Sequence, residues 1–349
     1  SAAHVWIEGQ VEVLNQDGTW CWRRHGRLYD PEISLGRRAL GPAREKYLNV
    51  LVDLGTHLIS VVVPPVGLHY RSCSGRACAM GLSEVTDQLN ICLAQLNPTV
   101  GDLPGNAERL RVAVAEAANS GADLVVTSEL YLCGYPPEDL VRRQSFLDEI
   151  KRTVADLAGE TRDGPAILLG TPWQEGEAVY NAALLLAQGE VAAARYKSDL
   201  PNYGVFDEKR VFDPGELPGP IQFKGVRLGV MVCEDMWKPD VAQCLAETGA
   251  EVLVVLNGSP FELDKWEERD GLAKDRVRET GLPLLYVNQV GGQDELVFDG
   301  SSFAINGDGT GALLMPAWEE ATTLATLARH KGSLRFDEGV MHRPGDRLA

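Results

Sequence analysis

Three reactive side chains follow three apolar segments of this sequence at the point where each segment ends. Glu129 follows ADLVVTS, Lys197 follows EVAAARY, and Cys233 follows VRLGVMV. Each segment has the apolar, β-branched composition of a buried strand, and ligands of open α/β sheets gather beyond the carboxyl ends of the strands. We therefore expect the three side chains to lie together at one edge of the fold. Ser259, just beyond EVLVVLN, belongs to the same edge.

A carboxylate, an ammonium and a thiol are complementary parts of one mechanism. A thiol becomes a strong nucleophile when a base or a cation lies beside it. A carboxylate shielded from water can act as general base and then as general acid, and an ammonium can stabilise a thiolate and an oxyanion. Taken singly, Glu129 and Lys197 could be exposed and Cys233 could be a buried structural thiol. The combination of the three favours nucleophilic catalysis by Cys233.

The positions of the histidines exclude the commonest alternatives. Residues 70–329 contain none, since the six histidines are His4, His25, His57, His69, His330 and His342. That region therefore has no Ser-His-Asp or Cys-His catalytic pair and no histidine-rich metal site. It also has no GxxxxGK[ST] loop and no GxGxxG between a strand and a helix. A metal site at His69, Cys73 and Cys78 with the remote Cys21 would have irregular spacing, so we expect no metal.

From Leu89 onward, short apolar runs alternate with amphipathic helical stretches, which is typical of a layered α/β domain. We expect strands at 89–96, 122–128, 166–170, 178–187, 190–196, 226–232, 251–257, 283–289, near 296–304 and at 311–315. The turn GDLPGN should lead to a helix that begins near Asn106, with Asn106 as its N-cap. Further helices are expected at about 138–157, 238–248 and 263–280.

Residues 1–79 do not share this rhythm, and their charge differs. Residues 1–80 hold 9 Lys/Arg against 7 Asp/Glu, whereas the whole chain of 349 residues has a net charge of −17. We expect a working domain over residues 80–340 and a short tail or linker at 341–349. Residues 1–79 would then be a leader, an artefact or a misassigned start, and the alternative is an ordinary N-terminal extension that packs on the domain.

Composition limits the partners and the compartment. The net charge of −17 argues against a nucleic acid or an anionic membrane as partner, because both need a basic face. The most apolar run, 58–68, is about half the ~20 residues that span a bilayer, and it contains a Pro-Pro break. The seven cysteines are scattered without a repeated spacing, which favours a reducing compartment. We therefore expect a cytoplasmic protein.

Longer strings around these residues resemble a known family. SELYLCGY, KSDLPNYGVFDEKRVF and VCEDMW resemble, in that order, the catalytic blocks of the nitrilase (carbon–nitrogen hydrolase) superfamily. LPNYGVFDEKRVF, CEDMW and NGSPFELDKWEER are also similar to the glutamine-hydrolysing domains of glutamine-dependent NAD⁺ synthetases. The resemblance covers roughly residues 88–340 and implies a four-layer α-β-β-α sandwich. It also implies a triad of Glu129, Lys197 and Cys233, with Glu208 as an additional carboxylate.

The resemblance implies a substrate and a mechanism as well. Glu129 would take the thiol proton of Cys233, whose sulfur would attack the carboxamide of glutamine, and water would hydrolyse the thioester to glutamate. Lys197 and the backbone N–H of Glu234 would hold the oxyanion. This amidase step would need no cofactor. Residues at positions that orient glutamine in the synthetase branch are Tyr203, Trp237, Ser259 and Lys265. Trp237 could equally be pocket wall or core.

The resemblance also implies a partner. The sequence ends at MHRPGDRLA and contains no SGGxDS loop, the motif of the ATP-pyrophosphatase domain that follows the amidase in that family. We therefore expect ATP to be used only in a synthetase domain absent from this chain, acting in cis if the chain is a fragment or in trans if it is a subunit. The family tends to pair its sandwiches, so a homo-oligomer is implied. A stand-alone amidase on another small amide and a non-catalytic binding or regulatory module remain as alternatives.

Overall fold

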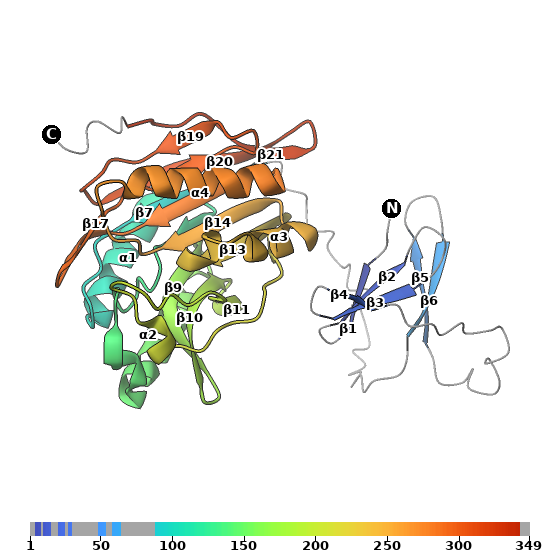
Figure 1. Cartoon of the computed structure of the whole chain (residues 1–349), viewed down its shortest axis with the longest axis horizontal. Helices are drawn as coiled ribbons and strands as arrows, with labels where there is room; N and C mark the ends of the chain where they lie inside the picture. Colours follow the sequence, from blue (N-terminus) through green and yellow to red (C-terminus); the bar gives the residue numbers. More distant parts are fainter. Residues whose placement is uncertain are drawn as a thin grey trace. The chain divides into compact units, whose positions relative to one another are not determined.

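The chain divides into two compact units, Ser1–Ala79 and Met80–Ala349. The computed structural model (Figure 1) describes residues 88–342 and, before them, only the backbone of short strands in the first unit. Those strands pair as one antiparallel sheet and one hairpin: β1 (His4–Ile7), β2 (Gln10–Leu14), β3 (Trp20–Arg24) and β4 (Arg27–Tyr29), then β5 (Leu48–Asp53) and β6 (Leu58–Val63). The hypothetical metal ligands Cys21, His69, Cys73 and Cys78 lie outside the described side chains.

The second unit is built on two sheets, whose strand orders are β11-β10-β9-β8-β7-β20-β21 and β12-β13-β14-β15-β18-β19. The first sheet consists of β7 (Gln88–Gln95), β8 (Leu124–Val126), β9 (Ala166–Glu175), β10 (Ala178–Ala187), β11 (Glu190–Tyr196), β20 (Ala321–His330) and β21 (Ser333–Phe336). The second consists of β12 (Ile221–Phe223), β13 (Val226–Val232), β14 (Val252–Asn257), β15 (Leu284–Asn288), β18 (Phe303–Ile305) and β19 (Gly311–Leu314). A separate hairpin is formed by β16 (Val290–Gln293) and β17 (Leu296–Asp299).

Helices cover the outer face of each sheet. The α-helices are α1 (Leu103–Asn119), α2 (Gln144–Glu160), α3 (Pro239–Glu247) and α4 (Lys265–Thr280). Short 3₁₀ turns lie at η2 (Glu138–Arg142), η3 (Glu208–Arg210) and η4 (Cys233–Met236). Among the described residues, no helix has both the length and the apolar character to cross a membrane.

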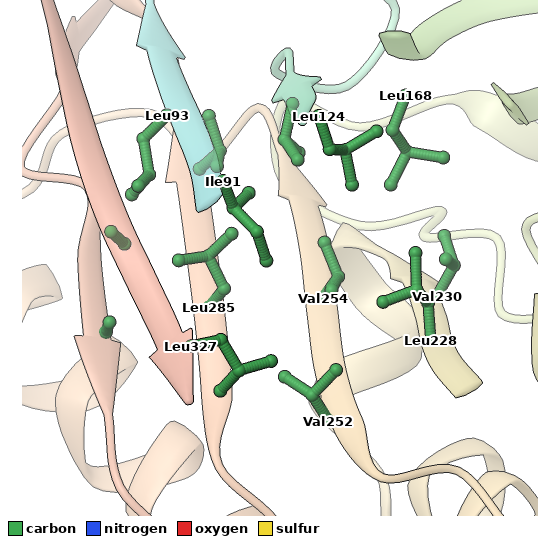
Figure 2. Close-up of a cluster of buried hydrophobic side chains, with 14 of the residues drawn as sticks. Ile91, Leu93, Leu124, Leu168, Leu228, Val230, Val252, Val254, Leu285 and Leu327 are labelled. Atoms are coloured by element: carbon green, nitrogen blue, oxygen red, sulfur yellow. The ribbon is translucent and has the colours of Figure 1, made fainter. Parts of the chain in front are cut away.

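The alternation of side chains along the strands creates the layers. Leu93 of β7 and Val254 of β14 point into the core between the two sheets (Figure 2). The neighbouring Cys92 faces α1 and α2, and Val255 faces α3 and α4. Both sheets are therefore apolar on both faces, as expected for strands covered on each side. The four-layer α-β-β-α sandwich is confirmed.

The predicted start of the first helix was wrong, and a ten-residue strand was not predicted. Helix α1 begins at Leu103 rather than near Asn106, and its N-cap is Asp102, whose side chain accepts a hydrogen bond from the backbone N–H of Gly105 at 3.0 Å. Proline is compatible with the first turn of a helix, so Pro104 does not delay the start. Strand β20, which pairs with β7 from Ala321 to Ala328 and extends the first sheet, was not expected from the sequence.

Candidate active site

The three reactive residues lie beyond strand ends, as expected. Lys197 directly follows β11, Cys233 directly follows β13, and Glu129 lies three residues beyond β8. The backbone N–H of Glu129 donates to the carbonyl oxygen of Asn257, the last residue of β14, at 3.3 Å. This bond links the end of a strand in the first sheet to the end of a strand in the second. The candidate site therefore lies where the carboxyl ends of both sheets meet.

Lys197 is held between two carboxylates. Its Nζ lies 2.7 Å from Oε1 of Glu129, and 2.8 Å and 2.9 Å from the two carboxylate oxygens of Glu208. Glu129 and Lys197 are 0% exposed, and Glu208 is 4% exposed. A buried charge is tolerated only when it is paired and hydrogen-bonded, so this cluster depends on all three members. The structure thus brings together three of the four predicted catalytic side chains by direct contact.

Burial and neighbouring charges shift the pKa values of Lys197 and Glu208 in opposite directions. Burial alone lowers the pKa of Lys197, but the negative charges of Glu129 and Glu208 outweigh it, so the pKa lies well above the ordinary value. Burial raises the pKa of Glu208, although the Lys197 ammonium acts to lower it. Lys197 is therefore a permanent cation at neutral pH, and Glu208 holds its proton more tightly than an exposed carboxyl does.

Cys233 has a strained backbone and an un-ionised thiol. Its φ is +45°, a left-handed conformation that costs roughly 1–3 kcal/mol for a residue other than glycine. Burial, followed by the negative charge of Glu129, raises the pKa of the Cys233 thiol well above the ordinary value, although Lys197 opposes the shift. The resting thiol is protonated, so nucleophilic attack requires a base. Within residues 88–342, Oε2 of Glu129 is buried and has no hydrogen-bond partner, which makes it a fitting acceptor.

Asp235 is a further buried residue of this site and was not expected there from the sequence. Its Oδ1 accepts hydrogen bonds from the backbone N–H groups of Ser198 and Asp199, both at 2.9 Å. Its Oδ2 accepts from the backbone N–H of Val232 at 3.0 Å. Asp235 therefore ties the segment after Lys197 to the end of the strand that carries the cysteine. The signal was its place in VCEDMW, two residues beyond Cys233.

Asp235 is expected to make the stability of the fold depend on pH. Burial raises the pKa of Asp235 to about 7, although its backbone hydrogen bonds act to lower it. An acid whose pKa is raised on folding contributes stability that is present below the ordinary value of about 3.9 and lost as the pH rises through the folded value. The free energy of unfolding of the wild type, minus that of Asp235→Asn, should therefore fall between pH 4 and pH 8, by ~1.4 kcal/mol for each unit of raised pKa.

Urea unfolding at a series of pH values measures this difference. In Asp235→Asn, an NH₂ group replaces one of the two acceptor oxygens, and this costs the same stability at every pH. Only the pH-dependent part of the difference in unfolding free energy therefore reports the titration of the Asp235 carboxyl group. Asp240→Asn, at an exposed position of α3, controls for the loss of one negative charge. A difference that stays constant from pH 4 to pH 8 would contradict the prediction.

Four of the five predicted substrate-binding residues form two pairs. The hydroxyl of Tyr203 donates to Oε2 of Glu234 at 3.0 Å. The ammonium of Lys265 lies over the ring of Trp237, 4.4 Å from the centroid, so Trp237 is the face of a cation–π contact. Lys265 also pairs with the half-exposed Glu268 at 2.9 Å.

Ser259 lies on the loop between β14 and α4, and Asn288 of β15 holds its backbone. The Asn288 side chain accepts from the Ser259 N–H at 3.2 Å and donates to the Ser259 carbonyl at 3.4 Å. The Ser259 hydroxyl is buried and, in the part of the chain that the structure describes, unpaired. An oriented serine with a free hydroxyl suits a polar ligand.

Asn181 and Tyr135 also contact the carboxylates, and sequence reasoning did not assign them. Asn181 Nδ2 donates to Glu129 at 2.7 Å, and the hydroxyl of Tyr135 donates to Glu208 at 3.0 Å. A polar residue inside the apolar run AVYNAALLLA was the available signal for Asn181. The described side chains contain no cluster of three or more potential metal ligands.

Comparisons with known proteins show which family this chain resembles. A model of the carbon–nitrogen hydrolase family matches residues 90–333. The glutamine-dependent NAD⁺ synthetase of Rhodobacter capsulatus is 46% identical over 263 residues, which are 75% of this chain and 48% of that protein. The synthetase of the same name from Aquifex aeolicus is 40% identical over 263 residues, 73% of this chain and 46% of that protein. The chain thus spans about half the length of these curated relatives.

Solved structures give the same result. The glutamine-dependent NAD⁺ synthetase of Acinetobacter baumannii, in complex with ADP, superposes with a TM-score of 0.69 at 33% identity, covering 73% of this chain and 48% of that one. A mutant amidase of Nesterenkonia sp. AN1, with the acetamide moiety of fluoroacetamide added covalently at the active-site cysteine, superposes with a TM-score of 0.63 at 29% identity. That match covers 69% of this chain and 90% of the amidase. The chain therefore belongs to the carbon–nitrogen hydrolase family of amide-hydrolysing enzymes.

Proposed function

We propose that this chain hydrolyses the side-chain amide of glutamine to glutamate and ammonia through a thioester on Cys233. The observation that carries the proposal is the buried cluster in which Lys197 contacts Glu129 and Glu208, while one oxygen of Glu129 has no partner among residues 88–342. The buried Cys233 thiol, whose pKa is raised by burial and by the negative charge of Glu129, would lose its proton to that oxygen. The glutamine specificity is supported by the relatives named glutamine-dependent NAD⁺ synthetase.

The proposed reaction begins with transfer of the thiol proton from Cys233 to Glu129. The sulfur attacks the amide carbon, and the carbonyl electron pair moves onto the oxygen. When the tetrahedral intermediate collapses, the C–N bond breaks and the nitrogen takes the proton back from Glu129, so ammonia leaves. A water molecule then gives a proton to Glu129 and attacks the thioester carbon. The C–S bond breaks, and Glu129 returns this proton to the sulfur, which restores the thiol and releases glutamate.

One N–H group of the Lys197 ammonium would remain available to donate a hydrogen bond to the oxyanion. An ammonium has three N–H groups, of which one faces Glu129 and one can be shared by the two oxygens of Glu208. The third N–H can stabilise the oxyanion together with the backbone N–H of Glu234. Glu208 would act as a positioning residue that aims the ammonium.

The pairs around the cluster suit the amino-acid end of glutamine. The Lys265 ammonium, held over Trp237, can pair with the α-carboxylate, and the Ser259 hydroxyl can donate to it. Glu234, which already accepts from Tyr203, can accept from the α-ammonium.

Release of glutamate and ammonia from glutamine by the purified chain is the primary test, with butyramide as an amide that lacks the amino-acid end. Turnover of glutamine supports the proposal. Turnover of butyramide with equal or higher kcat/KM would favour an amidase for small amides, a function suggested by the 90% coverage of the Nesterenkonia amidase. Hydrolysis of neither amide would contradict both assignments and favour a non-catalytic module.

Replacing Lys265 with methionine should separate recognition from chemistry. A hydrogen bond to a charged group contributes about 1.5–3 kcal/mol, so Lys265→Met should raise the KM for glutamine by about 10- to 100-fold and leave butyramide turnover unchanged. Steady-state kinetics on both amides measures the effect. Lys274→Met, on the same helix and 43% exposed, is the matched control. An equal loss on both substrates would show that Lys265 supports the fold or the chemistry instead.

The ammonia would serve NAD⁺ synthesis. We infer a synthetase domain as partner, in cis or in trans, because the curated relatives carry a further half beyond the matched region. ATP would be used in that domain, and the amidase step would use no cofactor. The proposed location is the cytoplasm, and the proposed assembly is a homo-oligomer. Glutamine-dependent NAD⁺ formation on mixing the chain with a synthetase domain and ATP would test the partnership.

A further inference from the structure

The two oxygens of the Glu129 carboxylate are in different environments. Oε1 accepts from Lys197 at 2.7 Å and from the side-chain amide of Asn181, also at 2.7 Å. Oε2 is buried and accepts from no side chain or backbone group of residues 88–342. An oxygen that already accepts two short, directed hydrogen bonds is a poor site for a proton, whereas its bare neighbour is a good one.

Asn181 is fixed in place by the sheet. It lies in β10 opposite Lys197, and the backbone N–H of Lys197 donates to the Asn181 carbonyl at 2.8 Å. The Asn181 side chain reaches Glu129 from β10, and the Lys197 side chain reaches it from the position directly after β11. Asn181 Nδ2 also lies 3.3 Å from Oε2 of Glu208, so both of its neighbours are carboxylates. The nitrogen of this amide must therefore face the cluster, since an oxygen there would meet only acceptors.

Gly258 keeps the other side of Glu129 open. A Cβ added at Gly258 would lie 3.0 Å from Oε2 of Glu129 and 3.4 Å from Cγ of Tyr135. The first contact is at the limit of what side chains tolerate, and Tyr135 is buried and packed against Phe298. A side chain at position 258 would consequently crowd the oxygen that has no partner.

We propose that Asn181 is a positioning residue that selects Oε2 of Glu129 as the atom exchanging the proton with Cys233 and with the leaving ammonia. The inference rests on the proposed function. Asn181 and Lys197 occupy Oε1 throughout, so the carboxylate cannot rotate to present it. The proton of the thiol moves to Oε2, passes to the nitrogen when the C–N bond breaks, and is replaced at Oε2 by a proton of the attacking water. Gly258, which has no side chain, leaves the space beside Oε2 that these proton transfers require.

Asn181→Ala removes the amide and leaves Lys197 as the single donor to Oε1. General acid–base catalysis contributes about 10²- to 10⁴-fold, so we expect kcat on the amide that the wild type hydrolyses to fall by about 10²-fold while KM changes less than about threefold. Asn181→Ser, whose hydroxyl is a shorter donor, should recover part of the loss. Asn306→Ala is the matched control, because Asn306 is also buried and bonds the backbone of Phe336 through both side-chain atoms.

Alkylation of Cys233 by iodoacetamide tests the same inference without any amide substrate. In Asn181→Ala, alkylation of the Cys233 peptide, followed by mass spectrometry, should be about tenfold or more slower than wild type at pH 7. It should approach the wild-type rate at high pH, where the thiol ionises without a base. A purely structural defect would change the rate at every pH. If glutamine and butyramide are not hydrolysed, the proposed function fails while this measurement still decides the role of Asn181.

The Gly258→Ala variant provides a second test of the inference, which does not require the Asn181 variants to fold. Crowding of Oε2 should lower kcat and neutral-pH alkylation in the same direction as Asn181→Ala. The inference is overturned if folded Asn181→Ala keeps both the kcat and the alkylation profile of the wild type, or if Asn181→Ser recovers none of the loss. It is equally overturned if Gly258→Ala has wild-type values for both.

Discussion

Cys233→Ala is expected to abolish amide hydrolysis, with kcat lower by about 10⁴-fold or more. The sulfur forms the bond that becomes the thioester, and no water molecule can replace it within the same two-step route. The thiol is small and buried and makes no ion pair in the described structure, so the variant should fold. Ammonia release and urea unfolding measure the two expectations.

Cys92→Ala is the matched control for this variant. Cys92 is also a free, buried thiol, but it lies in β7 on the face that packs against α1 and α2. Burial raises its pKa to about 12, so it is inert at neutral pH. The control should keep wild-type turnover. Retention of more than about one per cent of activity in Cys233→Ala would remove Cys233 as the nucleophile.

Lys197→Met should destabilise the protein as well as inactivate it. The change leaves Glu129 and Glu208 buried without a counterion, and loss of one partner of a buried ion pair costs about 3–5 kcal/mol. The loss of stability should become smaller as the pH falls, because Glu208, whose pKa burial already raises, then takes up a proton and is no longer an unpaired charge. Urea unfolding at pH 7 and pH 5 measures both effects.

Two further variants make this prediction specific. Lys197→Met combined with Glu208→Gln should recover part of the stability, because one of the two unpaired charges is gone, but it should remain inactive. Lys224→Met breaks an exposed pair with Asp123, and such pairs contribute about 1 kcal/mol or less. If Lys197→Met is no less stable than Lys224→Met, the carboxylates are not held by the ammonium.

The sequence predicted the members of the site that differ chemically from their surroundings. Glu129, Lys197 and Cys233 interrupt apolar runs at strand ends, and the order of three motifs indicated a known family and its sandwich. Asn181 could not be predicted as a contact of Glu129, because that contact depends on the order of the strands in the sheet and on the register of β10 against β11. Register is a property of pairing across the sheet, which a single strand's composition does not specify.

Strand β20 was missed for a related reason. Its sequence, ATTLATLARH, is short of large apolar residues, and most of its side chains are only partly buried. Its strand conformation comes from eight residue pairs with β7 rather than from its own pattern. The start of α1 was misplaced because Pro104 and Gly105 predict a turn locally, whereas Asp102 caps the helix before them. Tertiary pairing and capping decided both cases, and neither is visible in hydrophobic periodicity alone.

The pairing of β7 with β20 has a consequence for folding during synthesis. β7 is the first strand of the second unit, and β20 lies more than two hundred residues later in the chain. Until β20 emerges from the ribosome, one edge of β7 lacks its native partner strand. During that time Leu89, Ile91 and Leu93, which are buried in the folded protein, remain exposed on the nascent chain. Contacts of such long sequence separation slow folding, and an open apolar edge favours aggregation. Nascent chains that stall before Ala321 should therefore be the ones that chaperones bind.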